Sequence, residues 1–146
     1  MINKTIKCHA FALFGILIVI TLSTVCFASS DWDPDSVVSM MKLAMGDSFS
    51  EFDNNLSFYN DNTIRFIVDM DASKDYALSN KSQLYDQWST LRDNLTGVSQ
   101  SGYDVLKTLG CGDKFFVVTV LDNVYDEASD VWLIVVNGNV VYDMYN

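Results

Sequence analysis

Carboxylates are the side chains in this sequence that could most readily carry out chemistry. Seventeen of the nineteen acidic residues are Asp. Oxygen-bearing side chains alternate with other residues in two clusters: Asp31, Asp33 and Asp35, and then Asp69, Asp71, Ser73 and Asp75. Alternating oxygen ligands are typical of calcium loops, but an EF-hand loop also needs Gly at its sixth position and Glu at its twelfth. The first cluster has Ser36 and Lys42 at those places, and the second cluster fails at both places too. We interpret both as solvated turns and expect no metal or cofactor, with weak calcium binding by the 69–75 loop as the alternative.

Paired carboxylates could also hydrolyse glycosidic bonds, a reaction that needs no histidine. With seventeen Asp residues, a pair at a suitable separation arises by chance, so this signal has little specificity. A carboxylate-based hydrolase acting on cell-wall carbohydrate is therefore an alternative to the binding function considered below.

Histidine and cysteine are almost confined to the N-terminal segment. The sole histidine is His9, and two of the three cysteines are Cys8 and Cys26, which leaves only Cys111 beyond residues 1–28. The remaining chain therefore cannot support Ser-His-Asp or Cys-His catalysis, a zinc site of the usual His-containing kind, or an internal disulfide. We interpret Cys111 as an inert thiol and expect the protein not to be an enzyme.

The first 28 residues predict export. Two lysines precede a stretch without charged side chains, Ala10 to Ala28, and Cys26 with Ala28 fits the small-x-small pattern of a cleavage site. We expect cleavage after Ala28, which leaves a single extracytoplasmic domain of residues 29–146. The alternative is an uncleaved membrane anchor made by the same apolar stretch, with the domain outside.

The net charge of residues 29–146 limits the classes of molecule that we expect as binding partners. They contain seven basic and nineteen acidic side chains, a net charge of −12 at neutral pH. Nucleic acids and anionic lipids both need a cationic surface, so we expect neither as a partner. A protein partner or a second copy of the chain remains, with membrane contact only through the N-terminal segment if it is uncleaved.

The elements that would position any site follow from hydrophobic spacing and turn residues. Gly97 predicts a stop between two consecutive helices, because glycine commonly ends a helix. The full prediction is a helix opened by Asp33-Pro34, strands over 56–59 and 63–70, helices over 80–96 and 102–109, and strands over 114–122, 130–136 and 139–145. This order, α-β-β-α-α-β-β-β, predicts an α+β fold with helices packed on a mostly antiparallel sheet of about four to five strands.

The last two strands form the clearest motif. Asn137-Gly138 is the preferred two-residue hairpin loop, and it predicts that Val135 pairs with Val140 and Leu133 with Tyr142. In this register Leu133 and Tyr142 face the core.

The opposite face of the hairpin is apolar too, although one face of an antiparallel sheet is commonly solvated and polar. It contains Trp132, Ile134, Val136 and Val141. Either the N-terminal helix covers this face or it is a surface for a partner or ligand. The leading hypothesis is a small exported binding or interaction module that uses this apolar-aromatic sheet face, and a carrier of an apolar ligand is a further alternative.

Overall fold

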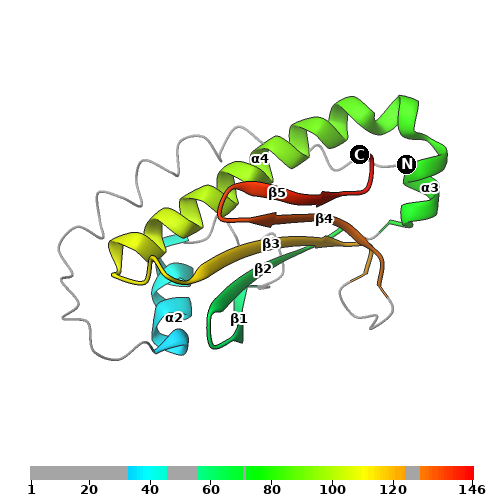
Figure 1. The fold of residues 1–146 in the computed structure, drawn as a ribbon. Helices are drawn as coiled ribbons and strands as arrows, with labels where there is room; N and C mark the ends of the chain where they lie inside the picture. The colour runs from blue at the N-terminus through cyan, green and yellow to red at the C-terminus, as the bar shows by residue number, and fades with distance from the viewer. Residues whose placement is uncertain (1–32, 46–55, 71, 124–128) are drawn as a thin grey trace.

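The computed structural model describes residues 33–45, 56–70, 72–123 and 129–146, which form three helices and five strands (Figure 1). In chain order they are α2 (Pro34–Met45), β1 (Leu56–Asn60), β2 (Thr63–Asp69), α3 (Lys74–Ser79), α4 (Lys81–Thr108), β3 (Phe115–Leu121), β4 (Val131–Val136) and β5 (Asn139–Asp143). The α+β class is confirmed, and the order of elements roughly fits the prediction, although α3 was not predicted and the helices predicted over 80–96 and 102–109 both fall on α4. The expected export segment, residues 1–28, lies outside the described residues.

The five strands form one mixed sheet in the order β1-β2-β3-β4-β5. Neighbouring strands pair antiparallel except β2 and β3, which run parallel. α3 and α4 connect these two strands and return the chain to the end of the sheet where β2 began, as a parallel pair requires. The prediction of a mostly antiparallel sheet therefore misses the parallel pairing of β2 with β3.

The hydrophobic core lies between one face of the sheet and the helices. α4 runs along β3, β4 and β5, and α2 lies beside β1 (Figure 1). Fully buried residues of the strands point toward these helices, and α2 adds three residues to the same cluster: Ile64, Phe116, Val118, Leu133 and Val135 from the strands, with Val37, Val38 and Met41 from α2. We call this the helix side of the sheet and the opposite side the outer face.

α4 is one continuous helix of 28 residues, so the prediction of two helices separated at Gly97 is wrong. Its buried stripe continues across the expected break, from Leu95 to Ser99 and Gly102. Gly97 is exposed and does not have the positive φ of a helix-ending glycine. Because both halves of the stripe pack on the sheet, their burial outweighs the cost of about 1 kcal/mol that a glycine brings to a helix interior.

The helix instead ends at Thr108, and the backbone turns at Gly110, whose φ is +79°. The N–H of Gly110 donates to the carbonyl of Lys107 at 3.0 Å, and the N–H of Cys111 donates to the carbonyl of Leu106 at 2.8 Å. These two bonds form a Schellman motif, in which a left-handed residue satisfies the last carbonyls of the helix. The backbone therefore turns toward β3 directly after this glycine.

The β4–β5 hairpin turns at the predicted dipeptide. Asn137 and Gly138 both have positive φ, +49° and +78°, as a two-residue loop of this type needs. Val135 pairs with Val140, which confirms the predicted register next to the turn.

A bulge at Val141 makes the rest of the predicted register wrong. Ile134 pairs with Tyr142, and Leu133 pairs with Asp143 instead of Tyr142. One extra residue in a strand moves all following side chains to the other face. Tyr142, predicted to lie in the core, is therefore 39% exposed on the outer face, and Asp143 is buried on the helix side.

β4 has a second irregularity, at Trp132. Leu133 pairs with Val120, and Val131 pairs with Leu121, so Trp132 has no paired position on β3. Its ring lies on the helix side, with its centroid 5.6 Å from that of Trp88 in α4, and the residue is only 4% exposed. Trp132 is thus a core residue, and its predicted place on the opposite face is wrong.

Candidate functional site

The outer face carries every second residue of the strands. On β2 these residues include Arg65 and Ile67, and strand pairing aligns them with Val117 and Thr119 of β3. The same rows continue across β4 and β5, because Val117 pairs with Val136, and Thr119 pairs with Ile134. The result is a continuous surface whose centre is almost entirely apolar.

The structure brings two of the four predicted surface residues together on this face. Ile134 and Val136 are partly buried neighbours in the middle of it. Val141 lies in the bulge of β5 and is 66% exposed, away from the central rows, and Trp132 lies in the core. The candidate surface therefore keeps Ile134 and Val136 and gains residues from β2 and β3 that the hairpin pattern alone did not indicate.

The described helices pack on the other side of the sheet. Every buried apolar residue of these helices belongs to the core cluster, and Ile67 is the buried apolar residue of the strands that lies outside it. The expectation that the N-terminal helix covers the outer face does not hold for α2, since its buried residues pack in the core cluster. An apolar sheet face that no described helix covers is typical of a surface that contacts another molecule.

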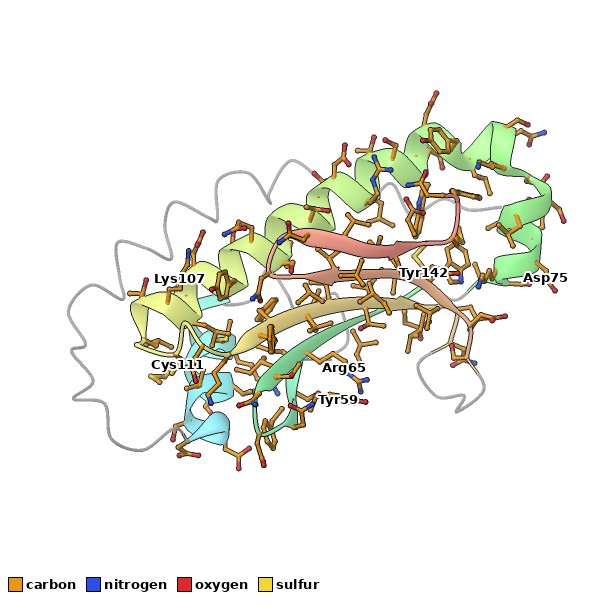
Figure 2. The ribbon with its side chains drawn as sticks, in the orientation of Figure 1. Tyr59, Arg65, Asp75, Lys107, Cys111 and Tyr142 are labelled. Atoms are coloured by element: carbon orange, nitrogen blue, oxygen red, sulfur yellow. The ribbon has the colours of Figure 1, made fainter. Side chains whose placement is uncertain are left out.

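Aromatic and cationic side chains lie together at both edges of the outer face. The guanidinium of Arg65 is 4.4 Å from the ring centroid of Tyr59, and Figure 2 shows the two side chains next to each other. At the opposite edge, the Nζ of Lys74 donates to the hydroxyl of Tyr142 at 3.2 Å and lies 5.6 Å from its ring. Tyrosine and arginine are the residue types enriched where protein interfaces derive most of their binding energy.

The two cations differ in their charge partners. The ammonium of Lys74 is 3.8 Å from the carboxylate of Asp130. Within the described residues no carboxylate pairs with Arg65, and its Nε is buried without a hydrogen-bond partner. Arg65 is therefore an incompletely satisfied donor on an apolar face.

A buried polar centre on the helix side escaped the sequence analysis. The side chain of Asp143 is 1% exposed and accepts hydrogen bonds from the indole of Trp88 at 2.9 Å and from the backbone of Tyr145 at 3.0 Å. Its second oxygen is 3.3 Å from the guanidinium of Arg92. This centre fixes the C-terminal strand to α4. In the sequence, the one feature that indicates this centre is the carboxylate of Asp143 within an otherwise apolar strand.

The thiol of Cys111 lies beyond the C-terminal end of α4 (Figure 2), half-buried and unpaired. Burial, together with the negative charge of Asp113, raises the pKa of this thiol above its ordinary value. A raised pKa lowers the thiolate fraction at neutral pH, so the site lacks the activation that a nucleophilic cysteine needs.

Two described carboxyl groups have shifted pKa values, and both shifts are downward. The hydroxyl of Ser36 donates to Asp33 and lowers its pKa, and the hydroxyl of Ser129 does the same for Asp122. A glycosidase acid needs a raised pKa. These hydrogen bonds therefore favour the opposite protonation state.

Two further features are absent from the described residues. No three His, Cys, Asp or Glu side chains come together there in an arrangement that could hold a metal ion. None of the described helices combines the length and the apolar character that crossing a membrane requires.

Comparison with known proteins gives no family to which the chain could be assigned. No family model, curated protein or solved structure matches it. The function is therefore argued from the outer face itself.

Proposed function

We propose that this chain is an exported, non-enzymatic interaction module that binds a protein through the outer face of its sheet. The observation that carries the proposal is the apolar centre of that face, in which Ile134, Val136 and Val117 lie side by side with no described helix over them. Burying such a surface against a partner releases about 25 cal/mol for each Å² of apolar area removed from water.

The composition of the face fits a protein partner. Its apolar centre is bordered by Tyr59 with Arg65 at one edge and by Tyr142 with Lys74 at the other. An apolar centre inside a polar and aromatic rim is the usual anatomy of a protein–protein interface. Export places this partner outside the cytoplasm, and the N-terminal segment supports that location.

Site-specific photocrosslinking tests the proposal in the native host. A photoreactive side chain at Val136 on the outer face should form covalent adducts with a protein. The same group at Gln87, an exposed position of α4, should not. Equal adducts at the two positions, or none at Val136, would contradict a dedicated surface.

The Ile134→Asp variant separates a binding surface from a hidden part of the core. We expect it to abolish the crosslinks formed from Val136. Because Ile134 lies in the outer face, the variant should lose only about 1 kcal/mol of the free energy of unfolding, the range of strand preferences. Circular dichroism and urea unfolding measure this cost, and loss of the fold would show that the face is covered in the free protein.

A further inference from the structure

We infer that the partner of the outer face is a second copy of this chain, bound in a two-fold dimer that pairs Arg65 with the partner subunit's Asp69. This inference rests on the proposed function and names its partner. It begins from Arg65, which no described carboxylate pairs with and whose Nε is buried without an acceptor. A buried donor without an acceptor is unfavourable, so a partner that supplies an acceptor there gains binding free energy.

The same strand supplies that acceptor. Asp69 lies four residues after Arg65 on β2, and both residues alternate with the buried Phe66 and Val68, so both lie on the outer face. Four residues of strand separate them by about 13 Å. A cation and a carboxylate thus lie on one strand, on either side of Ile67.

A two-fold axis makes this arrangement self-complementary. If the axis crosses the strands along the row that contains Ile67, Thr119 and Ile134, it exchanges positions 65 and 69 of β2. Arg65 then faces the partner's Asp69, and Asp69 faces the partner's Arg65. In the same way Val117 faces the partner's Leu121, which places apolar side chains against each other beside the two ion pairs. An isologous contact of this kind closes as a dimer.

The size of the face sets the expected affinity. Five strands spaced about 4.8 Å apart and about 20 Å long present about 500 Å². Two such faces bury about 1,000 Å² in total, at the low end of specific interfaces. The net charge, −10 for the full chain and −12 for residues 29–146, adds repulsion. We therefore expect dissociation in the micromolar range rather than an obligate dimer.

Charge reversal tests the pairing, by sedimentation velocity over about 1 µM to 1 mM on the protein as recovered from the exporting cell. Arg65→Asp and Asp69→Arg should each weaken the dimer at least about tenfold, since two ion pairs are lost by symmetry. The double variant restores both pairs with exchanged signs and should dimerise within about threefold of the unmodified protein. Lys42→Asp on α2 and Asp86→Arg on α4, both exposed, are the matched controls and should have no effect.

Three results would overturn the inference: a monomer throughout the range, a dimer that charge reversal leaves intact, or a double variant that stays monomeric. Asp69 is exposed at the end of β2, so Asp69→Arg gives a test that does not depend on folding of the Arg65 variant. The crosslinks formed from Val136 distinguish failure of the dimer inference from failure of the proposed binding function. Adducts with twice the mass of the chain support the dimer, whereas adducts of another mass keep the interaction module and exclude a second copy as its partner.

Discussion

Alanine substitutions at the two glycines of α4, Gly97 and Gly102, test how closely this helix packs on the sheet, through their effect on the free energy of unfolding. Gly97 has no atom within 4 Å of the place where a Cβ would stand, so Gly97→Ala should stabilise the protein by about 0.5–1 kcal/mol through helix preference alone. At Gly102 a Cβ would lie 2.6 Å from two ring carbons of Phe116. That ring is fully buried, so it can move away only by displacing other core atoms. Overpacking a core in this way costs about 1–3 kcal/mol.

The difference between the two variants isolates the contact, because both gain the same helix preference. Urea unfolding, followed by tryptophan fluorescence and by circular dichroism, should place Gly102→Ala about 1–3 kcal/mol below Gly97→Ala. Destabilisation by Gly97→Ala would refute the continuous helix, since at a position with open space around the Cβ alanine is unfavourable only where the backbone has positive φ. Equal free energies of unfolding for the two variants would refute the close contact between α4 and β3.

Two further predictions concern buried and half-buried groups. Asp143→Ala leaves the N–H groups of Trp88 and Tyr145 without their acceptor and should cost about 2–5 kcal/mol in urea unfolding. Asp93 is the other carboxylate that pairs with Arg92, and its side chain is 67% exposed, so Asp93→Ala should cost less than about 1 kcal/mol. Equal losses of unfolding free energy in the Asp143 and Asp93 variants would argue against the buried centre. In a chain with Cys8 and Cys26 replaced by Ser, Cys111 should react with iodoacetamide at about pH 8 more slowly than free cysteine, because its raised pKa lowers the thiolate fraction. Asp113→Asn removes a negative charge that raises this pKa and should accelerate the reaction, and an unchanged pH profile would refute that assignment.

Local signals predicted those parts of the fold that local geometry controls. Asn137-Gly138 gave the hairpin turn, because positive φ at two successive residues is a property of the dipeptide itself. Gly97 gave a false stop, because a glycine ends a helix only where the chain must turn. Gly110 satisfies that condition and Gly97 does not, and the decision depends on how the helix packs on a sheet formed elsewhere in the chain.

The two bulges could not be predicted, because the groups that they orient meet partners far away in the sequence. Asp143 bonds to Trp88 and Arg92, which are 55 and 51 positions away. Trp132 packs on the same tryptophan. A hairpin pattern contains none of this information, so the regular register was the only one that it could indicate.

The position of Arg65 depended on the parallel pairing of β2 with β3, which no turn residue indicates. This pairing places Arg65 beside Val117 and extends the face that contains Val136 toward the β1 edge of the sheet. The bulge at Val141 acts on the same face, because without it Asp143 would lie there and Tyr142 in the core. The irregularity that fixes the C-terminal strand to α4 therefore also keeps a carboxylate off the outer face, and this leaves its apolar centre uninterrupted between the two aromatic edges.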